Sequence, residues 1–178
     1  MHSPISPGVP PPVVLRHFRS DDAVTHLSGE DEATSKWLSG GVSTEESVLR
    51  WIQSNEDNWS SEGPRFAFAV QTLEGDLAGV IEINVDYVHF AGLGPGDANV
   101  SYGLYSQYRG RGLATSALLN VRDFMIAKGV QRAVIRVEPE NVDSVRLAER
   151  CGYVHIGAVT NGAGTEYLVF VDDLSSES

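Results

Sequence analysis

The clearest periodic pattern in the chain is helical and lies in its second half. Apolar residues recur there at the three- and four-residue spacing of one helix face. They are Ala114, Ala117, Leu118, Val121, Phe124 and Met125. Gly129 then stands where helices commonly end. The pattern predicts a long helix with one buried face.

Residues 77–87 alternate as in a β-strand, so that odd-numbered and even-numbered positions form two sets. One set is apolar apart from a glycine, and the other becomes polar towards its end, at Glu82, Asn84 and Asp86. Successive side chains of a strand point to opposite faces of its sheet. We therefore expect these three polar side chains to line one surface and to open it into a wet cleft.

The remaining segments predict an alternating order of strands and helices. Strands are expected at 13–19, 65–72, 98–105, 132–138, 153–159 and 165–172, and a short helix at 142–151. One further helix is expected after Ser20. Another begins at Ser43 or Thr44, and Ser43 with Glu46 three residues later fits a capping box, whereas Thr44 with Ser47 does not.

The length and composition fit one folded domain. The chain has 178 residues, of which 42% are hydrophobic. We expect a proline-rich, disordered leader at 1–12, one domain at 13–174 and a frayed tail at 175–178. No apolar run approaches the ~18–20 residues that span a bilayer, and the start lacks a signal-peptide pattern. A cytoplasmic protein that does not act at a membrane is expected.

The polar composition narrows the candidate chemistry. A single cysteine, Cys151, and five scattered histidines predict no metal site. The net charge of −11 argues against a nucleic-acid partner, because such proteins need Lys and Arg to neutralise phosphates. Ten acidic residues but only two basic ones fall in 20–62. This segment suits a cationic partner, although a solvated acidic surface explains the charge equally well.

A glycine loop with charged neighbours precedes the long helix. Gly110 and Gly112 leave the backbone N–H groups unobstructed, and the helix that follows adds unpaired N–H groups and the positive end of its dipole. Arg109 and Arg111 add positive charge, so the loop suits a phosphate or pyrophosphate. No Gly-Lys-Ser/Thr is present, which excludes a Walker A loop, and the dinucleotide fingerprint is met only in part. An ordinary tight turn with surface arginines remains the alternative.

The loop, with the sequence Gln107-x-x-Gly110-x-Gly112, resembles the acetyl-CoA pyrophosphate loop of the GCN5-related N-acetyltransferase (GNAT) superfamily. Further likenesses are Val13–Asp22, similar to the opening of the family, and Asn141-x-x-Ser144 followed by Ala148–Tyr153. The RimJ/RimL-like branch is most similar. The resemblance implies a single-domain α/β (α+β) fold. Its mixed central sheet has about seven strands, the fourth and fifth splayed apart, and is flanked by about four helices.

The resemblance also implies where acetyl-CoA, the acyl donor, is bound. Backbone amides of 109–115 contact the pyrophosphate, the backbones of Leu104 and Tyr105 contact pantetheine and the acetyl carbonyl, and Asn141 contacts the pantetheine arm. The implied cofactor-binding residues are Leu104, Tyr105, Arg109, Gly110, Arg111, Gly112, Leu113, Ala114, Thr115 and Asn141. Taken without the loop, Asn141 would be a helix N-cap.

Catalysis of amine acetylation needs a base for the amine and a proton donor for the departing thiolate. Glu82 is the favoured base, with Asp86 also possible and Asp97 less well placed. Many members of the family carry a tyrosine donor where this chain has Ala148, so Ser144 or water is expected to replace it, with Tyr102 as a second candidate.

The expected function is therefore acetyl-CoA-dependent N-acetylation of a primary amine, either a protein N-terminus or a small cationic amine. The acceptor attacks the thioester directly. The alternative is a non-catalytic acyl-CoA sensor with the same fold, and a homodimer is possible in either case.

Overall fold

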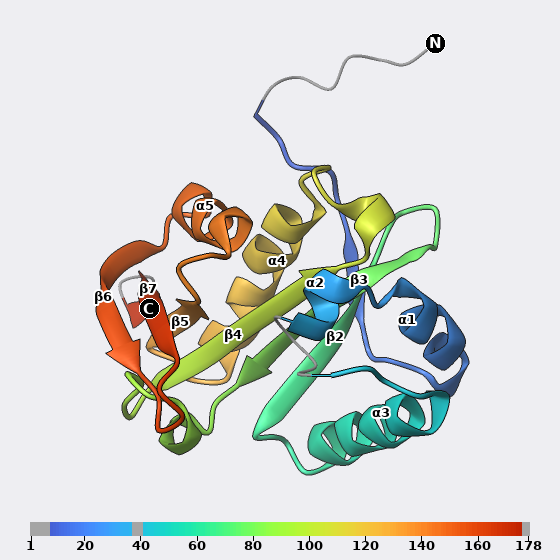
Figure 1. Cartoon of the computed structure of the whole chain (residues 1–178), viewed down its shortest axis with the longest axis horizontal. Helices are drawn as coiled ribbons and strands as arrows, with labels where there is room; N and C mark the ends of the chain where they lie inside the picture. Colours follow the sequence, from blue (N-terminus) through green and yellow to red (C-terminus); the bar gives the residue numbers. More distant parts are fainter. Residues whose placement is uncertain (1–7, 37–40, 176–178) are drawn as a thin grey trace.

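A computed structural model describes residues 8–36 and 41–175. Its centre is one seven-stranded sheet in the order β1-β2-β3-β4-β5-β7-β6 (Figure 1). The strands are β1 (Val14–Arg16), β2 (Arg65–Gln71), β3 (Leu77–Asn84), β4 (Asp97–Leu104), β5 (Arg132–Val137), β6 (Val154–Thr160) and β7 (Glu166–Asp173). All neighbours pair antiparallel except β4 and β5, which are parallel. The expected mixed sheet is confirmed.

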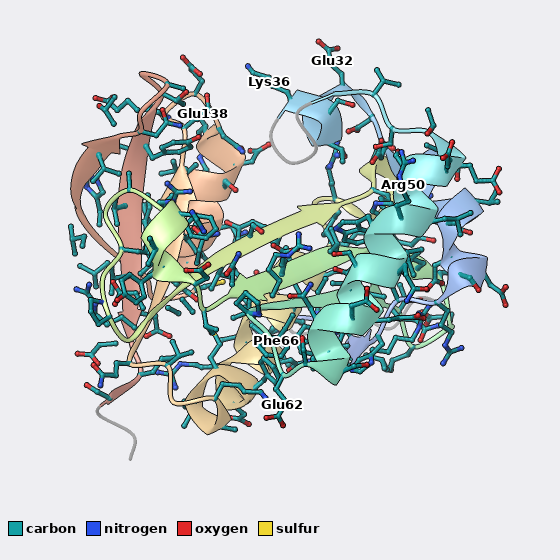
Figure 2. The ribbon with its side chains drawn as sticks, turned by 90° about the horizontal axis from the view of Figure 1, so that it is seen from below. Glu32, Lys36, Arg50, Glu62, Phe66 and Glu138 are labelled. Atoms are coloured by element: carbon teal, nitrogen blue, oxygen red, sulfur yellow. The ribbon has the colours of Figure 1, made fainter. Side chains whose placement is uncertain are left out.

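Helices cover both faces of this sheet. They are α1 (Ala23–Gly29), α2 (Glu32–Thr34), α3 (Glu45–Ser60), α4 (Leu113–Ala127) and α5 (Val142–Arg150). The larger core cluster joins α4 and α5 to one face, and a second cluster joins α1 and α3 to the other. In Figure 2, Arg50 projects from the solvent side of α3, whereas Phe66 of β2 is buried.

The predicted long helix is confirmed as α4, whose buried residues include Ala117, Leu118, Val121 and Met125. None of the helices in 8–36 and 41–175 is long and apolar enough to cross a membrane.

The parallel pair of strands opens along its length. Pairing of β4 with β5 runs only from Asp97–Arg132 to Asn99–Val134. β4 nevertheless continues to Leu104, held on its other side by β3 up to the pair Gly79–Leu104. The two strands therefore diverge, as the resemblance implied, and β4 keeps an unpaired edge just before the glycine loop.

The expected capping box of α3 is wrong. Helix α3 is capped by Thr44 and Ser47, each side chain accepting from the other's backbone N–H, rather than by Ser43 and Glu46. The serine hydroxyl performs the role that we expected of a glutamate. The hydroxyl of Ser43 instead donates to Glu30.

The third strand also differs from expectation. β3 ends at Asn84, whose side chain accepts from the backbone N–H of Asp86, so Asp86 leaves the strand face and pairs with His89. In the described part of the expected leader, the carbonyl of Pro11 accepts a hydrogen bond from Ser116 of α4. Of the expected leader, residues 1–7 lie outside the described residues, as do 176–178 of the expected tail.

Candidate active site

The first turn of α4 presents backbone donors without a capping side chain. Gly112 is the N-cap residue, with φ 81°, and offers no side chain to bond the first turn. The N–H groups of Leu113, Ala114 and Thr115 have no acceptor within the helix, and the first intrahelical bond runs from Ser116 to Gly112. Three N–H groups and the helix dipole thus converge on one point, which suits an anion such as pyrophosphate.

The two glycines of the loop are required for different reasons. At Gly112, a Cβ would lie 2.9 Å from Cδ of Pro11, and the positive φ disfavours any side chain there. At Gly110, φ is 70° but nothing lies within 4 Å of the Cβ position. Gly112 is therefore needed for packing against the leader, whereas Gly110 faces open space at the predicted anion site.

The two loop arginines have different surroundings. Arg109 makes a bidentate ion pair with Asp31, at 2.6 and 2.9 Å, and its Nε donates to the carbonyl of Leu104. Its backbone N–H donates to Ser106. The guanidinium holds the pKa of Asp31 well below its usual value. Arg109 thus fastens the loop to the α1–α2 connection, while Arg111 lies over the ring of Tyr108.

The backbone N–H groups of Leu104 and Tyr105, which were predicted to contact acetyl-CoA, have different surroundings. The N–H of Tyr105 donates to the carbonyl of Ala78 at 2.9 Å, so it cannot polarise an acetyl carbonyl as we expected. Bonding alternates along an antiparallel ladder, and Leu104 pairs with Gly79 one residue earlier. The N–H of Leu104 therefore points away from β3, into the opening between β4 and β5.

The start of α5 brings two candidate proton donors together. Asn141 is the N-cap, accepting from the N–H of Ser144, and this is the structural role that a helix-cap interpretation predicts. The Ser144 hydroxyl donates to the Tyr102 hydroxyl at 3.1 Å. Burial raises the pKa of Tyr102 to about 12, although Ser144 acts in the opposite direction. The phenol therefore holds its proton throughout the physiological pH range.

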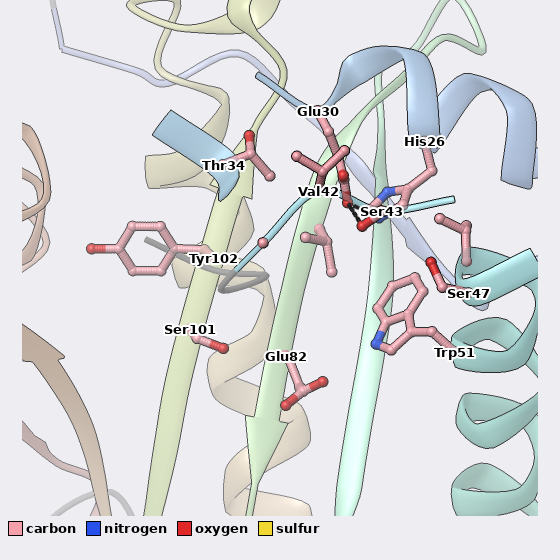
Figure 3. Close-up of a pocket in the computed structure, with 13 residues that line it drawn as sticks. His26, Glu30, Thr34, Val42, Ser43, Ser47, Trp51, Glu82, Ser101 and Tyr102 are labelled. Atoms are coloured by element: carbon pink, nitrogen blue, oxygen red, sulfur yellow. Dashed lines mark hydrogen bonds and ion pairs between the residues drawn. The ribbon is translucent and has the colours of Figure 1, made fainter. Parts of the chain in front are cut away.

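A pocket of about 510 Å³ lies on the α1–α3 side of the sheet. Its lining includes Glu30, Trp51, Val80, Glu82 and Ser101 (Figure 3). Of the three polar residues of 77–87 that were expected to line a wet cleft, only Glu82 lines this pocket. Two carboxylates beside an indole ring suit a cationic group.

Glu82 lies within this pocket, across from Ser101 in the β3–β4 ladder. Burial raises the pKa of Glu82, and Arg65 opposes the shift. A carboxylate with a raised pKa is a better base than an exposed one. Tyr102 also borders the pocket, but its ring points away from Glu82 in Figure 3, so the candidate base and the candidate proton donors lie towards opposite sides of β4.

Asp97, the third candidate base, is already ion-paired. Asp97 is buried and makes a bidentate ion pair with Arg132, at 2.6 and 2.7 Å, while accepting from the N–H of Gly94. It therefore has a structural role.

Of the residues that line the pocket, only Glu82 and Tyr102 were candidates from the sequence; those that it missed include His26, Glu30 and Trp51. Trp51 lies in none of the motifs described above, and Glu30 is one of the ten acidic residues in 20–62. The acidic excess of 20–62 was the only available signal, and it does not single out a residue.

Comparison with solved structures shows the fold of the chain. One match is described as a ribosomal-protein-serine acetyltransferase from Vibrio cholerae, with 23% identity, a TM-score of 0.71, and coverage of 93% of this chain and 95% of that one. A spermidine N-acetyltransferase from Vibrio cholerae in complex with CoA and spermine matches at 16% identity and a TM-score of 0.73, covering 92% and 96%. The aminoglycoside acetyltransferase AAC(6')-Ib in complex with coenzyme A matches at 18% identity and a TM-score of 0.73, covering 90% and 94%.

Comparison by sequence gives the family. The search of the curated proteins found no match. The acetyltransferase (GNAT) domain family, however, matches residues 13–154, which is most of the chain. This span includes the diverging strands, the uncapped first turn of α4 and the start of α5. The chain belongs to the GNAT acetyltransferase family.

Proposed function

We propose that this protein is an acetyl-CoA-dependent N-acetyltransferase of the RimJ/RimL-like branch. The observation that carries the proposal is the uncapped first turn of α4 beside the unpaired edge of β4. Backbone donors there match a pyrophosphate and an extended arm with amide groups. Solved structures of the same fold contain CoA, as in the spermidine and aminoglycoside enzymes.

The acceptor is a primary amine that reaches the thioester from the α1–α3 pocket. Glu82 and Glu30 give this pocket negative charge, and Trp51 offers a ring face. Such a lining favours a cationic amine over an alcohol or an anion. A protein N-terminus and a small polyamine both meet this requirement.

Catalysis divides between the two sides of β4. Glu82 removes a proton from the ammonium group, directly or through water, and the neutral amine attacks the thioester carbonyl. The N–H of Leu104 stabilises the negative charge that develops on the carbonyl oxygen. Tyr102, polarised by Ser144, donates a hydrogen bond to the departing thiolate. As the C–S bond breaks, the former amine nitrogen loses its second proton, which reaches the thiolate through water. Asn141 holds the start of α5 in place.

A sensor without turnover is the alternative function. The observation that favours it is Ala148, which replaces the usual tyrosine and is fully buried. Tyr102 and Ser144 weaken this argument, because they supply hydroxyl donors from neighbouring elements.

Thiol release from acetyl-CoA in the presence of an amine panel tests the proposal. We expect amine-dependent thiol, a raised melting temperature with acetyl-CoA, and loss of turnover but not of acetyl-CoA binding in Glu82→Gln. A protein that binds acetyl-CoA and releases no thiol with any amine is a sensor. A protein whose melting temperature does not change at millimolar acetyl-CoA contradicts the proposed site.

A further inference from the structure

A chain of polar side chains connects the end of β4 to the far wall of the α1–α3 pocket. The hydroxyl of Tyr105 lies 2.7 Å from Nδ1 of His26. Nε2 of the same ring lies 3.9 Å from Oε1 of Glu30, and this carboxylate also accepts from the Ser43 hydroxyl at 2.7 Å. None of these contacts is used in the reaction as proposed above.

The side chains of His26 and Tyr105 are tightly packed. His26 and Tyr105 are both buried, and the His26 ring stacks on Trp51 with centroids 5.0 Å apart. A Cβ at Gly29 would lie 2.5 Å from the Tyr105 ring, so this end of α1 packs directly on the phenol. Such packing leaves the imidazole little freedom to turn.

The hydrogen-bond geometry selects one protonation state for His26. Nε2 faces the Glu30 carboxylate, which can only accept. A neutral imidazole has one donor and one acceptor nitrogen, so its proton lies on Nε2 and the Tyr105 hydroxyl donates to Nδ1. At 3.9 Å the contact of Nε2 with Glu30 is electrostatic rather than a hydrogen bond.

We infer that Tyr105 and His26 are positioning residues of the acceptor pocket. Tyr105 fixes the His26 tautomer, and His26 with Ser43 orients the Glu30 carboxylate towards a cationic group of the acceptor. This inference rests on the proposed function and extends it, because it assigns acceptor binding to the wall of the pocket opposite Glu82. Packing alone would explain the buried ring but predicts no effect on the amine.

The charged groups around His26 support a neutral ring. Glu30 and Asp22 favour its protonation, but burial outweighs them and lowers the His26 pKa. Asp22 is already paired with Arg16, at 2.7 and 2.8 Å. From α3, the packed residue is Trp51, which does not titrate. A protonated His26 would neutralise Glu30 and compete with the cationic acceptor.

The first test is nitrogen-resolved NMR of the imidazole in the whole protein, without any ligand. We expect His26 to be neutral at pH 7 with its proton on Nε2, and its pKa to rise in Tyr105→Phe. A proton on Nδ1, or a charged ring at pH 7, overturns the inference. Since the wild-type spectrum decides this point, a variant that fails to fold does not prevent the test.

The second test separates the KM for the amine from kcat, using the amine that gives the most thiol. In Tyr105→Phe we expect this KM to rise about three- to tenfold, as for the loss of one hydrogen bond. The increase relative to wild type should be larger at pH 6 than at pH 8, because His26 charges as the pH falls. The KM for the amine should change more than kcat or the affinity for acetyl-CoA, because the implied contact of Tyr105 with acetyl-CoA is made by its backbone, which the substitution retains.

Two further variants complete the design. His26→Gln retains a donor and should restore part of the amine affinity that His26→Leu loses, whereas Tyr167→Phe removes a remote hydroxyl and serves as the matched control. An active Tyr105→Phe enzyme with an unchanged KM at both pH values overturns the inference alone. If the wild type releases no thiol with any amine, the proposed function fails and the acceptor role fails with it.

Discussion

Replacement of Tyr102 by phenylalanine removes the hydroxyl that we assign to the departing sulfur. The ring stays, so the packing of β4 against α4 and α5 is retained, and the Ser144 hydroxyl loses its acceptor at 3.1 Å. The affected step is departure of the thiolate, rather than binding of either substrate. kcat should therefore fall while the Kd for acetyl-CoA stays nearly constant.

The structure limits how large the effect can be. Transfer of a proton from a phenol with a pKa of about 12 to a thiolate, whose thiol titrates near ~8.5, is uphill by roughly 5 kcal/mol. Tyr102 therefore acts mainly by a hydrogen bond to the charged sulfur, which contributes about 1.5–3 kcal/mol. This corresponds to a loss of about 10- to 150-fold in kcat for Tyr102→Phe.

Ser144 should act through Tyr102 and therefore matter less. Loss of one neutral hydrogen bond, about 0.5–1.5 kcal/mol, predicts a decrease of roughly 2- to 12-fold in kcat for Ser144→Ala. In the Tyr102→Phe background the same substitution should have almost no further effect. Tyr102 must be protonated to act, and its raised pKa means that it causes no alkaline loss of activity below about pH 11.

Stopped-flow detection of thiol at saturating acetyl-CoA and amine measures these rates, and calorimetry gives the Kd for acetyl-CoA. The assignment is refuted if Ser144→Ala is slower than Tyr102→Phe, since the serine would then be the direct donor. It is also refuted if the two effects multiply in the double variant, because independent groups give additive free energies.

Three other substitutions test separate parts of the structure. Gly110→Asp should weaken acetyl-CoA binding roughly tenfold relative to Gly110→Asn, because both residues tolerate the positive φ and only aspartate adds a negative charge. Equal Kd values for the two variants would contradict the predicted anion site. Thr44→Ala should lower the free energy of unfolding by about 1 kcal/mol, measured in urea, and an unchanged value would contradict the observed cap. Asp97→Ala should lower the free energy of unfolding by about 1.5–3 kcal/mol, because the buried carboxylate accepts from the exposed Arg132 guanidinium and from the N–H of Gly94; an unchanged Kd for acetyl-CoA would confirm that its role is structural.

The sequence alone was sufficient for the periodic elements and for the family. The α4 stripe and the alternation of β3 reflect one buried face each, and a buried face must repeat with the period of its own element. The loop at 107–115 is equally local, because its glycines and the first turn of α4 follow one another in the chain. The family and its mixed sheet could therefore be inferred before any contact was known.

The tertiary structure decided which side chains meet. Tyr102 and Ser144 lie 42 residues apart and His26 and Tyr105 79 apart, so no local pattern relates them. It also decided that the Tyr105 N–H is used by Ala78 whereas that of Leu104 faces the opening, because ladder register depends on the partner strand. Acid–base roles depend on burial and on neighbours from other elements, and only folding brings those neighbours together.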